Sequence, residues 1–217
     1  MKILFILSGG LDSTTALYEL KKDCEVMEAI TFDYDQRHKR EIESAKKICE
    51  LLDLPHKIIN IKNFNELLQG SSLTSPQIAT PHGYYQEETM KQTVVPNRNA
   101  IMINIAAGYA ISKKIYGLGL GVHAGDHYIY PDCRPQFIAS QEQTLSLAND
   151  CDFKLFAPFL HINKAAVVAK GHELGVPFEY TWTCYEGSQK ACGKCGSCME
   201  RAEAFAQNNL SDPITYE

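Results

Sequence analysis

The chain has 217 residues, 45% of them hydrophobic, and a formal net charge of −5 at pH 7. This length supplies one sizeable core, or one domain with a small appendage, and the negative charge offers no basic field for direct nucleic-acid binding. The longest apolar stretch, residues 100–111, is interrupted by Asn104 and is too short to span a bilayer. The N-terminus carries no signal-peptide pattern, so we expect a cytoplasmic protein without a membrane contact.

Strand-like and helix-like segments alternate along the chain. Short apolar runs predict strands over residues 2–7, 25–32, 56–61, 117–122 and 153–157. Apolar residues at three- and four-residue steps predict helices over residues 12–22, 39–52, 99–115, 135–149, 163–174 and 197–207, with Asn163 as an N-cap. Residues 63–95 are rich in Gly, Pro, Ser and Thr and predict a long functional or mobile loop.

This order predicts an α/β fold with a Rossmann-like parallel sheet flanked by helices, in which ligands bind at the carboxyl ends of the strands. We expect a ligand-binding α/β domain over residues 1–175 and a small cysteine-rich region over residues 176–217.

The segment between the first strand and the first helix has the composition of a phosphate-binding loop. It reads Ser8, Gly9, Gly10, Leu11, Asp12, Ser13, Thr14 and Thr15. Glycines let backbone N–H groups approach phosphate oxygens, and the start of a helix adds unpaired donors and the positive end of a dipole. Asp12 can hold a magnesium ion. No Lys follows the glycines, so this is not the G-x-x-x-x-G-K-[ST] loop. The segment is similar to the PP-loop of the ATP pyrophosphatase family, and a plain Gly-rich turn is the alternative.

Four of the eight cysteines lie close together in the spacing C-x7-C-x2-C-x2-C. A tight turn in each C-x2-C pair lets two thiolates bind one ion, and four thiolates leave no position for water. We therefore expect one structural zinc ion. An iron–sulfur cluster or free buried cysteines are the alternatives. The expected zinc ligands are Cys184, Cys192, Cys195 and Cys198.

Three further places can bind a substrate or its phosphates. Arg98 can direct its donors at a phosphate or carboxylate, while Asn97 or Asn99 caps the helix that follows. Lys164, near a helix start, can neutralise a phosphate. The segment 125–134 gathers two carboxylates, two tyrosines and an Arg at the expected ligand edge. Its candidate residues are Asp126, Tyr130, Asp132 and Arg134. The alternatives are a plain capping segment, an exposed Lys and a solvated polar loop.

Four motifs together resemble the 7-cyano-7-deazaguanine synthase family of queuosine biosynthesis along essentially the whole chain. They are S-G-G-L-D-S-T, V-P-N-R-N, Y-P-D-C-R and T-W-T-C-Y-E-G…C-G-K-C-G-S-C. The resemblance implies an ATP-dependent carbon–nitrogen ligase that converts 7-carboxy-7-deazaguanine and ammonia to 7-cyano-7-deazaguanine through an activated carboxylate and an amide. It also implies a homodimer, ATP bound by residues 8–15, and one zinc ion bound by the four cysteines.

The candidate residues can be given roles in the reaction that the resemblance implies. We expect Asp12 with magnesium, Lys164 and Arg98 to stabilise charge on the phosphates. We expect Arg98, Asp126, Tyr130, Asp132 and Arg134 to bind the deazaguanine, with Asp132 accepting a proton from ammonium.

Three other functions compete. A tRNA-thiolating enzyme of the same ATP-using class would carry a persulfide, with Cys133 as the candidate carrier, but no basic region for tRNA is evident. A non-catalytic nucleotide-binding zinc module would not need the crowded polar loop. An NAD synthetase shares the Gly-rich loop, but the cysteine-rich tail fits it poorly.

Overall fold

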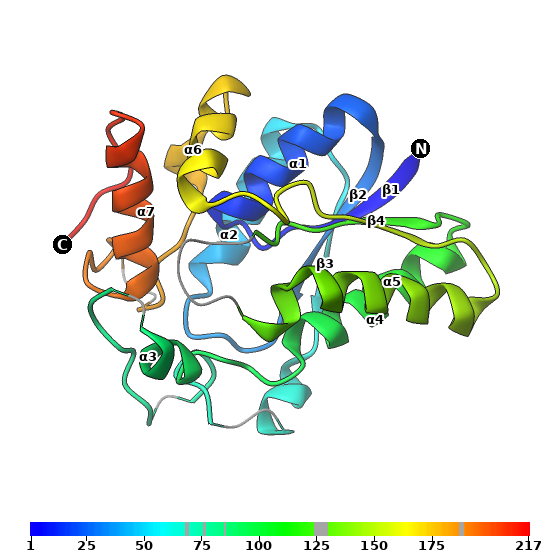
Figure 1. Cartoon of the computed structure of the whole chain (residues 1–217), viewed down its shortest axis with the longest axis horizontal. Coiled ribbons are helices and arrows are strands. Elements are labelled where there is room, and N and C mark those ends of the chain that lie inside the picture. The colour runs from blue at the N-terminus through cyan, green and yellow to red at the C-terminus, as the bar shows by residue number, and fades with distance from the viewer. Residues whose placement is uncertain (68–69, 76, 85, 124–129, 187–188) are drawn as a thin grey trace.

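A five-stranded parallel sheet forms the centre of the molecule (Figure 1). The computed structural model describes residues 1–67, 70–75, 77–84, 86–123, 130–186 and 189–217. The strands stand in the order β3-β2-β1-β4-β5. Their bounds are β1 (Lys2–Ile6), β2 (Glu25–Asp33), β3 (His56–Asn60), β4 (Gly117–Gly119) and β5 (Lys154–Phe156). The predicted Rossmann-like fold is confirmed, although β4 ends three residues before the predicted bound.

Two groups of helices cover the two faces of the sheet. Side chains of β1 point alternately to one face and to the other, so this strand contributes to both cores. Ile3 and Phe5 belong to one core, together with residues of α1 (Leu11–Asp23), α2 (Arg40–Leu51), α6 (Lys164–Glu173) and α7 (Gly196–Gln207). Leu4 belongs to the other core, which is closed by α4 (Arg98–Ser112) and α5 (Pro135–Asn149). The central strands are therefore buried on both faces, as parallel sheets require.

The C-terminal segment shares the first core. Ala204 and Phe205 of α7 pack in the same cluster as Leu17 of α1. The division of the chain at residue 175 stays a prediction. Asn163 caps α6 as expected, because its side-chain oxygen accepts from the backbone N of Ala166 at 2.9 Å.

Residues 63–95 are more structured than the predicted loop. They contain most of a short 3-10 helix, η1 (Lys62–Leu67), and a five-residue helix, α3 (Glu87–Lys91). Arg37 ties the segment to the sheet, because its guanidinium donates to Thr80 Oγ1 at 3.0 Å and to the carbonyl of Ile78 at 2.9 Å. Elements this short carry too little periodicity for detection in the sequence.

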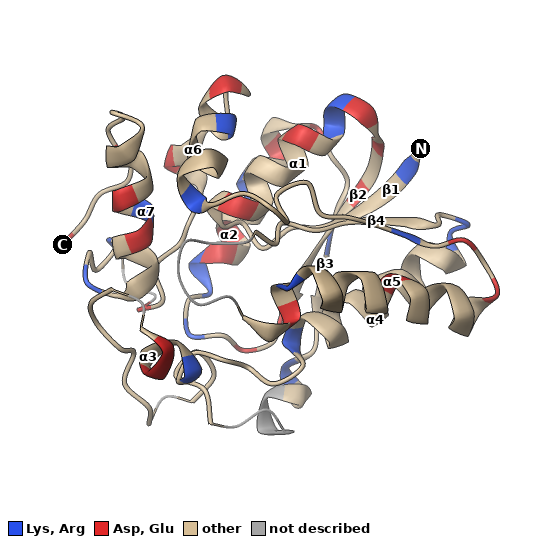
Figure 2. Cartoon of the chain, in the orientation of Figure 1, with Lys and Arg blue, Asp and Glu red and all other residues tan. Residues whose placement is uncertain are grey.

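The surface carries charges of both signs. Figure 2 shows Lys and Arg interspersed with Asp and Glu along the helices. Within the described ranges, no helix is long and apolar enough to cross a membrane. The cytoplasmic location and the absence of direct nucleic-acid binding stay predictions.

The sheet order places a binding crevice beside β1. From β1 the chain crosses through α1 to β2 on one side, while β4 lies on the other side, and ligands of α/β sheets bind where the strand order reverses in this way. The loops after β1 and β4 meet there. Gly121 lies so close to α1 that an added Cβ would stand 2.4 Å from Ser13 Cα and 2.8 Å from Ser13 N.

This contact makes Gly121→Ala destabilising. The new methyl group would push against backbone atoms, so the free energy of unfolding should fall by roughly 1–3 kcal/mol in urea denaturation. Gly108→Ala is the matched control, because nothing lies within 4 Å of an added Cβ there and the residue is inside α4. This control should stabilise the protein by about 0.5–1 kcal/mol. Equal effects of the two substitutions would contradict the close approach of Gly121.

Candidate active site

The loop after β1 has a shape that only glycine permits at its first turn. Gly9 has φ of +87°, and an added Cβ would lie 2.1 Å from the carbonyl oxygen of Glu41. Its own carbonyl accepts from the backbone N of Trp182 at 3.0 Å. The loop is therefore fixed between α2 and the C-terminal segment before any ligand binds.

Hydroxyl groups of this loop form hydrogen bonds with one another and with the loop backbone. Ser8 Oγ and Ser13 Oγ are 2.8 Å apart, and the backbone N of Gly10 donates to Ser8 Oγ at 3.2 Å. Thr14 is fully buried, with no hydrogen-bond partner for its hydroxyl in the described structure. Thr15 donates its hydroxyl to the carbonyl of Leu11 inside α1 at 2.8 Å. Among the residues predicted to bind ATP, Gly9, Thr14 and Thr15 do not line the cavity described next.

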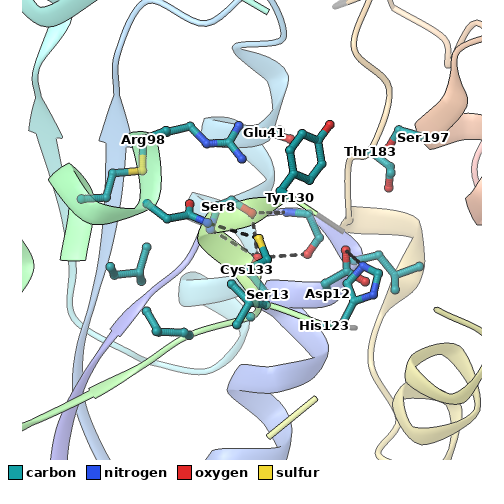
Figure 3. A pocket seen from close by; sticks show the side chains of 18 of the residues that line it. Ser8, Asp12, Ser13, Glu41, Arg98, His123, Tyr130, Cys133, Thr183 and Ser197 are labelled. Atoms are coloured by element: carbon teal, nitrogen blue, oxygen red, sulfur yellow. Dashed lines mark hydrogen bonds and ion pairs between the residues drawn. The ribbon is translucent and has the colours of Figure 1, made fainter. Parts of the chain in front are cut away.

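A cavity of about 280 Å³ opens beside the loop (Figure 3). It is enclosed by the ends of β1, β2 and β4, the starts of α1, α4 and α6, and the segment around Trp182 and Tyr185. The predicted residues at its wall are Ser8, Gly10, Leu11, Asp12, Ser13, Arg98, Tyr130 and Lys164. The fold thus brings the Gly-rich loop, the start of α4 and Lys164 to one place.

A buried ion pair lies at the side of the loop. Lys164 Nζ donates to Asp12 Oδ2 at 2.5 Å, and the Lys164 side chain is 4% exposed. Burial by itself would raise the pKa of Asp12, but the charge of Lys164, with His123 and Arg201, outweighs it and lowers that pKa. Asp12 Oδ1 is buried without a hydrogen-bond partner in the described structure. A free carboxylate oxygen of this kind fits a magnesium ligand.

The opposite wall of the cavity surrounds Arg98. Burial by itself would lower the pKa of Arg98, but Tyr34 and Asp132 raise it above its ordinary value, so the guanidinium stays charged. Tyr130 OH lies 2.5 Å from Thr93 Oγ1. Burial, with the charge of Asp132, raises the pKa of the Cys133 thiol to about 12. This wall therefore holds a fixed cation, Arg98, close to neutral polar groups and within the field of the Asp132 carboxylate.

The sequence predicts Asp132 and Arg134 at the substrate, but the structure places both outside the lining of the cavity. Asp132 Oδ2 accepts from the backbone N of Asn99 at 3.1 Å, so this carboxylate caps α4. Asn97 does occupy the N-cap position of α4, in the left-handed conformation, but its side chain makes no capping bond in the described structure, and Asn99 lies inside the helix. Asp132 and Arg134 are not among the residues that line the cavity, and Asp126 lies outside the described residues.

Several residues of the cavity wall are not predicted from the sequence. Gln36, His38 and Glu41 follow β2, and His123 follows β4, with its Nε2 3.7 Å from Asp12 Oδ2. The sequence does contain a signal for these four residues. They are polar and follow predicted strands whose carboxyl ends share one edge of the sheet, where ligands bind. Trp182, Thr183, Ser197 and Glu200 come from the distant C-terminal segment, and nothing local to them predicts the site.

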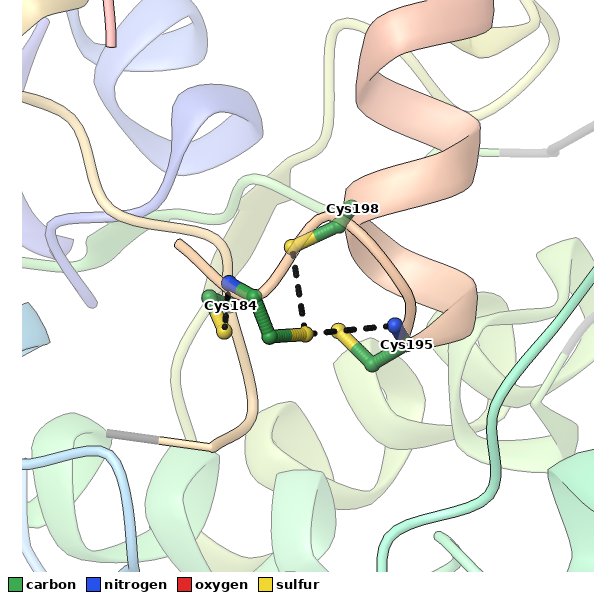
Figure 4. Close-up of side chains that lie close together, drawn as sticks. Cys184, Cys195 and Cys198 are labelled. Carbon is green, nitrogen blue, oxygen red and sulfur yellow. Dashed lines mark hydrogen bonds between the residues drawn. The ribbon is translucent and has the colours of Figure 1, made fainter. Parts of the chain in front are cut away.

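The four cysteines converge on one point (Figure 4). Their sulfur atoms all lie within 4.8 Å of one another, and all four residues are buried. Backbone N–H groups donate to the sulfurs, from Cys192 to Cys184 Sγ at 3.3 Å and from Cys195 to Cys192 Sγ at 3.3 Å. Hydrogen bonds from the thiols of Cys195 and Cys198 lower the pKa of Cys184. Such a set is compatible with one tetrahedral metal ion.

A buried arginine joins this cluster's helix to the cavity wall. Arg201 of α7 is 0% exposed and donates to both carboxylate oxygens of Asp212, at 2.8 and 2.9 Å. It also donates to Thr181 Oγ1 at 2.8 Å and Thr183 Oγ1 at 3.0 Å, on either side of Trp182. The backbone N of Trp182 donates to the Gly9 carbonyl, so Arg201 helps to hold the Gly-rich loop by fixing the segment that contains Trp182.

The fold and this site define a Rossmann-like α/β protein with a Gly-rich loop at the ligand edge of its sheet and a cysteine cluster near its C-terminus. The structure is similar to that of NMN synthetase from Francisella tularensis, with a TM-score of 0.52 and 15% identity. The match covers 96% of this chain and 77% of that one, and it concerns the fold alone.

The chain belongs to the family described as queuosine biosynthesis protein QueC, which it matches over residues 2–209. It is 49% identical over 216 residues to 7-cyano-7-deazaguanine synthase 1 of Colwellia psychrerythraea, covering 100% of this chain and 99% of that protein. It is 48% identical over 217 residues to the 7-cyano-7-deazaguanine synthase of Methanoregula boonei, covering 100% of both.

Arg201→Met should be strongly destabilising. It leaves Asp212, whose side chain is 7% exposed, without its buried cation, and the free energy of unfolding should fall by about 3–5 kcal/mol. Lys47→Met is the control, because Lys47 forms an exposed ion pair with Glu50 at 2.9 Å and its loss should cost at most about 1 kcal/mol. Urea denaturation measures both. A small effect of Arg201→Met would show that Asp212 finds another partner.

Proposed function

We propose that this chain is a 7-cyano-7-deazaguanine synthase, an ATP-dependent ligase that makes a nitrile from 7-carboxy-7-deazaguanine and ammonia. The observation that carries the proposal is the similarity to the named relatives, which runs the full length of the chain at about 49% identity. The geometry supports it, because one cavity holds a phosphate-type loop, a buried Lys and, across from them, a second fixed cation.

The reaction needs an activated carboxylate. Ammonia cannot displace oxide from a carboxylate, whereas an adenylate supplies a good leaving group. In this proposal ammonia forms an amide, and a second activation dehydrates the amide to the nitrile. The chain's contribution is to hold the reactants together and to offset the charge that develops on the phosphates.

We assign ATP to the loop formed by residues 8–15, of which Ser8, Gly10, Leu11, Asp12 and Ser13 line the cavity. Thr15 has its hydroxyl engaged inside α1, so its contribution is to the helix. Lys164, held by Asp12, would offset phosphate charge, and Asp12 Oδ1 would hold the magnesium ion. We assign the deazaguanine to the wall of Arg98 and Tyr130. Proton transfer through Asp132, and contacts through Asp126 and Arg134, stay predictions.

We propose that the cysteine cluster holds one structural zinc ion. Four sulfurs within 4.8 Å of one another fit ligands of a single ion, whereas an iron–sulfur cluster must fit several iron and sulfide atoms among its thiolates. Zinc bound there would fix the turn that precedes α7. The proposal also includes a homodimer in the cytoplasm.

The tRNA-thiolating alternative is weaker because its carrier would be Cys133. A persulfide carrier attacks as a thiolate, and the pKa of this thiol is raised to about 12. Few thiolates form at neutral pH under that condition. Sulfur transfer to tRNA that depends on Cys133 would overturn our proposal.

The proposed reaction is tested by incubating the protein with 7-carboxy-7-deazaguanine, ammonium, ATP and magnesium. Mass spectrometry should detect the nitrile, and AMP should form with it. An assay without ammonium is the control and should give no nitrile. ADP in place of AMP would contradict activation by adenylation, and ATP consumption without any product would favour a non-catalytic module.

Lys164→Met should lower turnover by about 100-fold or more, because it removes the buried cation beside the loop. The matched control is Lys170→Met on the same helix, whose side chain is 37% exposed and pairs with Glu173. Steady-state rates of nitrile formation measure both variants, and circular dichroism checks that each is folded. A folded Lys164→Met variant with near-normal turnover would refute this role for Lys164.

Metal analysis should find about one zinc ion per chain, released by a strong chelator with a fall in the melting temperature. Cys195→Ser should lose the zinc and lower the melting temperature. Cys24→Ser is its control, because Cys24 lies outside the cluster and should leave the metal content unchanged. Iron instead of zinc in protein purified without oxygen would contradict the assignment.

A further inference from the structure

The cavity wall holds two opposite charges that do not pair with each other. Glu41 of α2 and Arg98 of α4 both line the cavity, and Figure 3 shows Arg98 directed toward Glu41 with Tyr130 beside them. The ion pairs of the described residues include none between these two side chains. Glu41 lies beside the imidazole of His38, and Arg98 lies near Tyr34 and Asp132, so neither charge neutralises the other and a ligand with a donor edge and an acidic group can bind between them.

Glu41 is held rigidly. Its backbone carbonyl abuts Gly9, and its backbone N donates to the carbonyl of His38 at 3.1 Å. Its Oε2 lies 3.4 Å from His38 Nε2, and the two side chains are 15% and 3% exposed. The carboxylate is therefore fixed at the wall with acceptor capacity left for a ligand, since each carboxylate oxygen has two acceptor positions.

We propose that Glu41 is a specificity residue that binds the 2-aminopyrimidinone edge of the deazaguanine. This edge carries two adjacent donors, the ring N1–H and the exocyclic amino group, which match the two oxygens of one carboxylate. Arg98 then binds the acidic side of the same molecule, which is the carboxylate that becomes activated. The inference rests on the proposed function and adds a residue, Glu41, that recognises the deazaguanine.

The same chemistry argues against adenine at Glu41. The Watson–Crick edge of adenine places the N6 amino donor next to N1, a ring acceptor that would face the negative carboxylate. A fixed carboxylate therefore selects a guanine-type edge. The adenine of ATP must bind elsewhere in the crevice, which leaves Glu41 free for the substrate.

The experiment compares 7-carboxy-7-deazaguanine with its analogue that lacks the 2-amino group. For the unmodified protein, kcat/KM should favour the amino substrate by about 10- to 100-fold. Glu41→Gln should lose most of this preference, because the amide turns one acceptor into a donor that meets the donors of the base. The KM for ATP should stay unchanged. Glu41→Asp keeps the carboxylate and should retain part of the preference.

Glu43→Gln is the matched control, because Glu43 lies on the same helix with its side chain 69% exposed. It should leave kcat/KM for both substrates unchanged. Equilibrium binding of each base without ATP gives a second readout and should show the same loss for Glu41→Gln. If the unmodified protein converts the substrate and folded Glu41→Gln keeps the full preference, or if only the KM for ATP rises, this inference is wrong. If the unmodified protein makes no nitrile but binds the amino compound through Glu41, the proposed function fails and the recognition stands.

Discussion

The rest of the site depends on backbone packing around the loop that follows β1. Gly9 contacts the Glu41 carbonyl on one side, and Gly121 contacts Ser13 on the other, with no room for a Cβ at either place. These contacts fix the ends of β1, β2 and β4 relative to one another. Many polar groups of the cavity then have a defined position, because they lie within a few residues of those ends or on a helix packed against them.

Electrostatics divides the cavity into two parts. Lys164 is neutralised by Asp12 beside the phosphate-type loop, while Arg98 lies across the cavity among tyrosines and a protonated thiol. A cation already paired with a carboxylate attracts anions less strongly than an unpaired one. Arg98 makes no ion pair with another side chain in the described part of the chain, and it therefore suits a permanent anion such as a carboxylate, whereas Lys164 suits a position where negative charge develops during reaction.

Local patterns made part of this site predictable. The Gly-rich loop, the cysteine spacing and the Asn163 cap each lie within a few residues and could be recognised from sequence. Glu41 and His123 carry no local pattern, and they become recognisable only when the predicted sheet order is used, because both follow strands whose carboxyl ends share one edge of the sheet. Asp132 was assigned to the substrate because its chemistry suits binding, but the structure uses its carboxylate to cap α4. Composition alone does not distinguish a capping carboxylate from a binding one.

Trp182 connects two features that lie far apart in the sequence. Its backbone N bonds the Gly9 carbonyl, and its indole N–H donates to the carbonyl of Cys184 at 3.0 Å. One residue thus contacts both the phosphate-type loop and the first cysteine of the cluster. The loop and the tail therefore form a single structural unit. A Gly-rich loop transplanted onto another sheet without this tail would lose the contact that holds its first turn.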